Sequence, residues 1–168
     1  MERNLRRIIT GHNEEGKSIV AYDGPPMFGM NWVTNSSPAD NKHKNDAAMQ
    51  KVGLEPPTNG SKFAYFLLNP EDPSKSAEEL EKEWTAGFAA IDASHCRPDT
   101  SRHPGMHKTK TVDYIILLEG EVTMLLDEDE VELKPFDIVI QRGTNHAWIN
   151  KGTKPALLAT ILIDAEPI

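Results

Sequence analysis

Short apolar segments recur through the second half of the chain, and residues that favour turns separate them. The segments are Phe88–Ser94, Val112–Leu118, Glu121–Leu126, Glu130–Leu133, Ile138–Ile140, Ala147–Asn150 and Ala156–Ile163. After Pro104-Gly105, turn residues recur at intervals of 6–12 positions from Glu119-Gly120 onwards, at Asp127–Asp129, Lys134-Pro135, Arg142-Gly143 and Lys151-Gly152. Regular short strands at this spacing are typical of a β-sandwich or β-barrel and not of alternating strands and helices. The sequence therefore predicts an all-β fold for this region.

The first 61 residues have a different character. Three short apolar runs lie between turn signals and predict strands: Arg7–Thr10, Ser18–Tyr22 and Phe28–Val33. Asn35–Ser61 is polar and interrupted by prolines, so we expect a long loop, which is usually mobile or forms a functional lid. The apolar run Lys62–Asn69 then predicts a further strand. We therefore predict an extension over residues 1–61, serving as a sheet edge or dimerisation segment, and a β-barrel domain over residues 62–168.

One short helix is predicted between these strands. Ser76 precedes Glu79 by three positions, which is the spacing of a capping box at a helix N-terminus. Leu80 and Trp84 follow four residues apart on one helical face. The pattern predicts a helix from about Ala77 to Thr85, with Trp84 as a core residue in preference to a ligand platform.

Composition excludes several classes of protein. The 168 residues carry 26 acidic and 18 basic side chains, a net charge of −8, and no basic stripe with interleaved aromatics, so a nucleic-acid ligand is not expected. No apolar run is long enough to span a bilayer, and no apolar stretch typical of a signal peptide follows the basic N-terminal residues. The single cysteine, Cys96, excludes an internal disulfide bond. We expect a cytoplasmic protein with no membrane partner.

A set of polar residues shares one parity at the start of the most apolar strand. His107, Thr109 and Asp113 are separated by even numbers of positions, so on one extended strand their side chains lie on the same face. Lys108 and Lys110 fall on the other face, which suits their charge. The parity predicts that the first three side chains point into the barrel together.

The region of about residues 85–165 resembles the cupin superfamily. The first cupin motif contains His-x-His, a Glu and a closing Gly; here these places are taken by His107 and Thr109, by Asp113, and by Gly120. The second motif has counterparts in Gln141-Arg142-Gly143, His146 and Asn150. The segments HxTxTVDY and QRGTNHAW are similar to those of small single-domain cupins found in bacteria and in fungal clusters for aromatic polyketides, some of which are labelled oxidoreductases. The resemblance implies a cupin barrel (a double-stranded β-helix, or jelly roll) with an N-terminal strand extension and one short helix.

The resemblance also implies a metal site. Its ligands would be His107, Asp113 and His146, with Thr109 where the family has a second histidine, and we expect closure of the barrel to bring the strand of His146 opposite the first. Two imidazoles and a carboxylate bind non-haem Fe(II) or catalytic Zn, and the sequence does not distinguish these from Mn, Ni or Co. The alternative is a metal-free barrel in which His107 is hydrogen-bonded to Asp113.

Three further residues are candidates for catalytic roles. His103 could reach the barrel mouth as a base, although a structural or solvated histidine is the commoner case. Trp148 shares the parity of His146 and could stack on an aromatic substrate, with core packing as the alternative. Arg142 could hold a substrate carboxylate, with a surface arginine as the alternative.

The leading prediction for function is a metal-dependent enzyme of the oxidoreductase type. It would act inside the barrel on a small organic molecule, with aromatic or polyketide-derived compounds of secondary metabolism among the candidates. A lyase that dehydrates or decarboxylates its substrate is one alternative, and a non-catalytic ligand-binding or accessory protein is another, since this scaffold hosts many functions. The N-terminal strands need a sheet to join, and the resemblance implies a homodimer.

Overall fold

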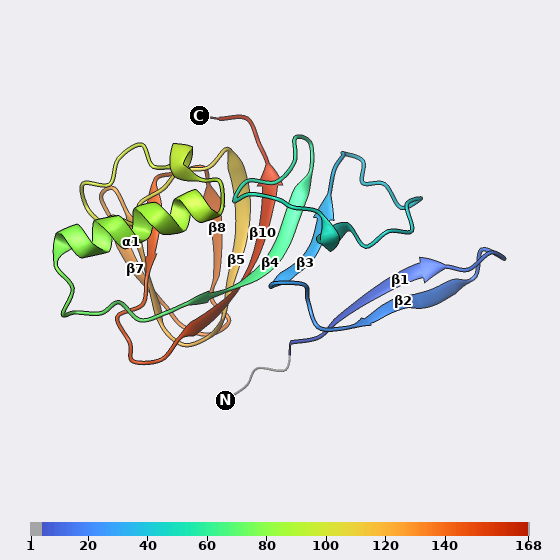
Figure 1. Cartoon of the computed structure of the whole chain (residues 1–168), viewed down its shortest axis with the longest axis horizontal. Helices are drawn as coiled ribbons and strands as arrows, with labels where there is room; N and C mark the ends of the chain where they lie inside the picture. Colours follow the sequence, from blue (N-terminus) through green and yellow to red (C-terminus); the bar gives the residue numbers. More distant parts are fainter. Residues whose placement is uncertain (1–4, 168) are drawn as a thin grey trace.

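The computed structural model describes residues 5–167, and these consist mainly of antiparallel β-strands (Figure 1). The strands are β1 Arg7–His12, β2 Ser18–Gly24, β3 Met30–Thr34, β4 Ser61–Leu68, β5 Thr111–Glu119, β6 Val122–Leu126, β7 Glu130–Leu133, β8 Ile138–Arg142, β9 His146–Ile149 and β10 Ala156–Asp164. The helices are η1 Ala47–Met49, α1 Ala77–Ala90 and η2 Ser94–Cys96, of which η1 and η2 are single 3-10 turns. No helix in this part of the chain is both long and apolar enough to cross a membrane.

Two sheets enclose the core. One has five strands in the order β3-β4-β10-β5-β8, and the other has three in the order β7-β6-β9. The main cluster of buried side chains draws on both sheets, including Leu117 of β5, Met124 of β6, Trp148 of β9 and Leu158 of β10. The predicted all-β barrel fold with one helix is therefore confirmed.

Side chains alternate along β5 as the sequence predicts. Thr111, Asp113, Ile115 and Leu117 are buried, whereas the side chain of Tyr114 between them is exposed. The strand ends at Gly120, whose φ of +90° suits glycine and where an added Cβ would lie 2.9 Å from the Cα of Ala156. The turn after β5 therefore packs closely against the start of β10.

The helix is longer than predicted. Its N-terminus has the capping box formed by Ser76 and Glu79, but α1 continues past Thr85 to Ala90. The predicted strand Phe88–Ser94 is therefore wrong: Phe88 is the buried residue of the helix and packs against Ala93 and Cys96. A short apolar run has no periodicity that separates a strand from the end of a helix, and Gly87 does not end this one.

The N-terminal strands separate into two groups. β1 and β2 form a two-stranded hairpin that projects from the barrel, whereas β3 pairs with β4 and extends the five-stranded sheet (Figure 1). The buried Arg7 of β1 connects the two groups, because it donates to the carbonyl oxygen of Asn31 at 2.8 Å and forms an ion pair with Asp46. The predicted domain boundary at residue 61 stays a prediction, and the pairing of β3 with β4 crosses it.

Candidate active site in the barrel

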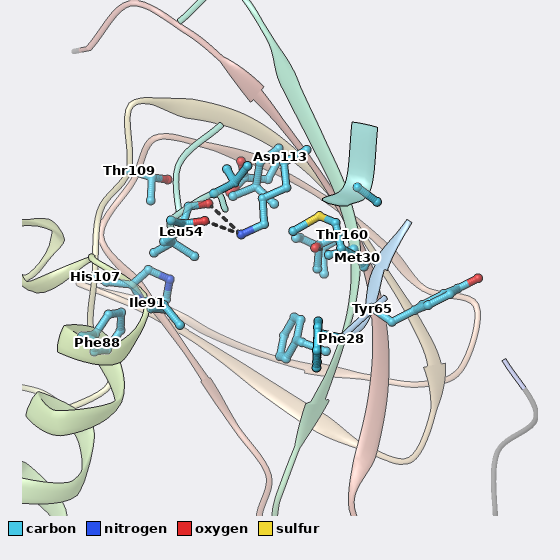
Figure 2. A pocket seen from close by; sticks show the side chains of 18 of the residues that line it. Phe28, Met30, Leu54, Tyr65, Phe88, Ile91, His107, Thr109, Asp113 and Thr160 are labelled. Atoms are coloured by element: carbon cyan, nitrogen blue, oxygen red, sulfur yellow. Dashed lines mark hydrogen bonds between the residues drawn. The ribbon is translucent and has the colours of Figure 1, made fainter. Parts of the chain in front are cut away.

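A cavity of about 490 Å³ opens between the barrel strands and the segment that precedes β4 (Figure 2). Most of its lining is apolar and comes from the strands, from the end of α1 and from the long loop: Phe28, Met30, Val52, Leu54, Phe66, Phe88, Ile91, Ile115, Trp148 and Leu162. The polar lining includes His107, Thr109, Asp113, His146 and Lys62. Such a cavity, mainly apolar with a few polar groups on its wall, is typical of a small-molecule site.

The two predicted histidine ligands are direct neighbours. His107 and His146 form an isolated antiparallel bridge in which each backbone N–H donates to the carbonyl oxygen of the other, at 2.8 and 2.9 Å. Their ring centroids are 4.2 Å apart. Closure of the barrel therefore brings the first residue of β9 directly across from the segment before β5, so the two histidines form one cross-strand pair.

Hydrogen bonds orient both imidazoles. The Nδ1 of His107 lies 2.9 Å from the carbonyl oxygen of Gly105, and the Nδ1 of His146 lies 2.9 Å from that of Thr144. A carbonyl oxygen accepts only from a protonated nitrogen, so Nε2 of each neutral ring keeps its lone pair. Burial lowers the pKa of His107, and burial together with the neighbouring His107 lowers that of His146 to about 3. Both rings are therefore neutral at pH 7, the form that binds metals.

Asp113 lies in the same cavity with an unsatisfied oxygen. Its side chain is buried, and the Oδ1 atom has no hydrogen-bond partner. Burial raises the pKa of this carboxyl group to about 6, although a hydrogen bond from Thr111 lowers it. An unpaired buried carboxylate oxygen is costly unless a ligand or ion satisfies it.

His107, Asp113 and His146 are residue types that bind divalent metals, but the distances between their ligand atoms suit a shared ion only in part. Two neutral imidazoles with fixed rings and one orphan carboxylate oxygen are suitable ligands. The possible ligand atoms of His107, Asp113 and His146 are not all within 4.8 Å of one another, so side chains must shift before all three can share an ion. Thr109, at the place of the second family histidine, is occupied by a 2.6 Å hydrogen bond to the hydroxyl group of Thr111.

A second group of possible ligands lies outside the barrel. Among the described residues, Glu55, His95 and Cys96 form the one group of three whose possible ligand atoms all lie within 4.8 Å. The Nε2 of His95 is 3.0 Å from Oε2 of Glu55 and 3.5 Å from Sγ of Cys96. Burial raises the pKa of Cys96 to about 11, so without a cation the group is a thiol beside a His–Glu contact. No local pattern predicts this group, because Glu55 lies forty residues from His95.

The structure separates the three predicted catalytic residues. Trp148 lines the cavity, and its ring packs edge-on against that of His146 at a centroid distance of 5.3 Å. His103 is not among the lining residues; its Nε2 lies 2.8 Å from Oε1 of Glu71. Arg142 is an exposed residue of β8 and does not line the cavity either. Their catalytic roles stay predictions, and the geometry favours Trp148.

Comparison with known proteins identifies the family. Residues 95–163 match the family model described as a cupin domain. The chain is 36% identical over 175 residues to the cupin-domain-containing oxidoreductase virC of Hypocrea virens, an alignment that covers 99% of this chain and 79% of that protein. This chain belongs to the cupin family. The cupin is also 26% identical over 179 residues to phomopsin biosynthesis cluster protein C' of Diaporthe leptostromiformis, covering 99% of this chain and 82% of the relative.

Solved structures show a more distant likeness. A cupin 2 conserved barrel domain protein from Salinispora arenicola has 13% sequence identity and a TM-score of 0.40, covering 62% of this cupin and 64% of that chain.

The relatives that match almost the whole chain come from fungi. Two fungal biosynthesis clusters are named among the matches: that of phomopsin and, over 39% of this chain, that of the oryzines of Aspergillus oryzae. The predicted relationship to cupins of fungal secondary metabolism is therefore confirmed.

Proposed function

We propose that this cupin is a metal-dependent oxidoreductase that acts on a small, mainly apolar organic molecule in the barrel. One observation carries the proposal: two neutral imidazoles are held side by side, with their Nε2 lone pairs free, on the wall of an apolar cavity. The similarity over almost the whole chain to a protein named as an oxidoreductase supports the type of reaction.

The residues of this chain would bind and shield the substrate. The apolar lining from Phe66, Phe88 and Leu162 excludes water from most of the cavity wall, and Trp148 offers an aromatic surface next to His146. His107, His146 and Asp113 would hold the metal after a shift of side chains that brings their ligand atoms together. A divalent ion with open coordination positions, when bound there, polarises an oxygen atom or takes part in redox chemistry.

Metal analysis of defined variants tests the site. We expect the purified wild-type protein to retain a divalent metal after dialysis, and His146→Ala and His107→Ala to lose at least about tenfold in metal affinity. His43→Ala is the matched control, because His43 is an exposed loop histidine, 84% accessible, whose removal leaves the barrel intact. Metal that persists in His146→Ala but disappears in His95→Ala would place the ion at the outer Glu55, His95 and Cys96 group and overturn the proposal.

The reaction type needs a separate measurement. We expect consumption of oxygen or of an added electron acceptor when the metal-loaded protein meets small aromatic substrates, with the signal absent in His146→Ala. Loss of water or carbon dioxide from the substrate without any oxidant would instead support the lyase alternative. Recovery of bound compounds unchanged under all conditions would support a binding protein.

A further inference from the structure

A lysine stands on the wall of the apolar cavity, and nothing in the predicted metal chemistry uses it. Lys62 is the second residue of β4, and its Nζ donates to the carbonyl oxygens of Gly53 at 2.6 Å and Leu54 at 3.3 Å. Figure 2 shows these two bonds as dashed lines beside Leu54, and Lys62 is one of the residues that line the cavity. Lys62 is half-buried, and this partial burial lowers the pKa of its amine.

The amine has no carboxylate partner. No ion pair or acidic hydrogen-bond acceptor of Lys62 occurs among residues 5–167, and the two acceptors that it has are neutral carbonyl groups. Asp113 lines the same cavity but lies two strands away, because both Lys62 and Asp113 pair with Leu162 of β10 from opposite sides. Lys62 is half-buried, and among the described residues it lacks the opposite charge that normally accompanies a cation held away from water.

Hydrogen bonds to the described residues use two of the three N–H groups of the Lys62 amine. An ammonium group carries three N–H donors, and the protein takes two of them. Within residues 5–167 the third N–H has no acceptor, and the lining of the cavity is mainly apolar. The only other lysine of the lining, Lys51, is exposed to solvent, so its charge is hydrated.

We propose that Lys62 binds a carboxylate of the substrate, so that the cavity takes a mainly apolar carboxylic acid. This inference rests on the proposed function in one respect, namely that the cavity is the substrate site. A single N–H donor with a positive charge suits one anionic oxygen, and the surrounding apolar wall suits the rest of an aromatic or polycyclic acid. A charge-assisted hydrogen bond in such a site raises affinity by about tenfold or more over a neutral isostere.

Binding of a matched pair of probes tests the proposal. Calorimetric titrations with 2-naphthoate and with 2-naphthamide compare an acid and a neutral molecule of almost the same shape. We expect the wild-type protein to bind the acid at least about tenfold more tightly. In Lys62→Met the affinity for the acid should fall to that for the amide. The affinity for the amide should change by less than about twofold. Lys51→Met is the control and should keep the preference for the acid.

The titrations are run after removal of divalent metal with a chelator, because a bound ion could itself attract a carboxylate. Failure of the metal proposal therefore leaves this test intact, and a metal-binding protein without acid preference overturns only the role of Lys62.

A purely structural role makes a different prediction. If Lys62 serves only to fasten Gly53 and Leu54 to the barrel, Lys62→Met weakens both probes equally and lowers the melting temperature. Lys62→Gln separates the roles further, since its amide can still donate to those carbonyls but has no charge. We expect Lys62→Gln to keep the fold and to lose the acid preference. Equal preference in Lys62→Gln and the wild-type protein, or no preference in the wild-type protein, overturns the proposal.

Discussion

Burial of the Asp113 side chain in the cavity is unfavourable for folding when its carboxyl group is charged. Its pKa is raised from 3.8 to about 6, which corresponds to about 3 kcal/mol between the two protonation states. A raised carboxyl pKa means that the folded state holds its proton more tightly than the unfolded state does. This destabilisation of the folded state is therefore absent below about pH 4, grows between about pH 4 and 6, and is fully present above about pH 6.

Asp113→Asn should stabilise the metal-free protein in a pH-dependent way. At pH 8 we expect the free energy of unfolding of the variant to exceed that of the wild type by up to about 3 kcal/mol, because the amide carries no charge to bury. At pH 4.5 the difference should shrink to about 1 kcal/mol or less. Urea denaturation at both pH values measures it. Asp129→Asn, at an exposed turn, is the control and should show no such trend, and an equal gain at both pH values would contradict the assignment.

Residue-level signals in the sequence located part of the site. Parity predicted that Thr109 and Asp113 both face inwards, and both are buried, although β5 begins only at Thr111. Lys62 was not recognised, since a lysine in an apolar strand usually points to solvent and only the path of Gly53 and Leu54 gives its amine acceptors. Glu55 was missed for a similar reason, because its contact with His95 depends on tertiary folding.

At the scale of elements, two glycines with different surroundings offer a paired test. Gly120 has a φ of +90°, and a Cβ there would lie 2.9 Å from backbone and side-chain atoms of Ala156. Gly87 lies within α1, and a Cβ there meets nothing within 4 Å. The same substitution should therefore have opposite effects at the two positions.

We expect Gly120→Ala to lower the free energy of unfolding by about 2 kcal/mol, through backbone strain and the clash with β10. Gly87→Ala should raise it by about 0.5–1 kcal/mol, because alanine has the higher helix propensity. Thermal and urea denaturation of the two variants give both values. A loss of stability in both would mean that Gly87 has a packing role that its open surroundings do not indicate.

The elements themselves were largely predictable from the sequence. The predicted bounds of β5 to β10 all lie within two positions of the observed ones, because glycine and proline act locally on the backbone. The end of α1 was not predictable, since Phe88–Ala90 are as apolar as a strand and their helical state depends on packing against Cys96. The pairing of His107 with His146 depends on closure of the barrel, which no local pattern encodes.

The whole molecule has unpartnered apolar surface on the projecting hairpin. Ile8, Ile19 and Val20 of β1 and β2 are 53%, 43% and 61% exposed. A second exposed apolar set lies on β8, the edge strand of the five-stranded sheet, where Ile138 and Ile140 are 65% and 53% exposed. Such side chains favour association, and a free edge strand favours pairing with another chain.

We therefore expect a homodimer in which the hairpin of one copy covers apolar surface of the other. Light scattering coupled to size-exclusion chromatography should give twice the mass of one chain for the wild type, and Ile8→Lys with Val20→Lys should shift it towards the monomer. Val131→Lys is the control, because Val131 is a similarly exposed apolar residue on β7, in the other sheet. A monomeric wild type at micromolar concentration, or an undisturbed dimer in the double variant, would refute this assembly.

The short connection between β2 and β3 has a consequence for ligand entry. Only five residues separate Gly24 from Met30, and Met27, Phe28 and Met30 of this stretch line the cavity. A second copy seated on the hairpin would restrain the stretch that forms this side of the opening. Apparent ligand affinity should then rise with protein concentration, so that a diluted sample and a concentrated one report different dissociation constants for the same compound.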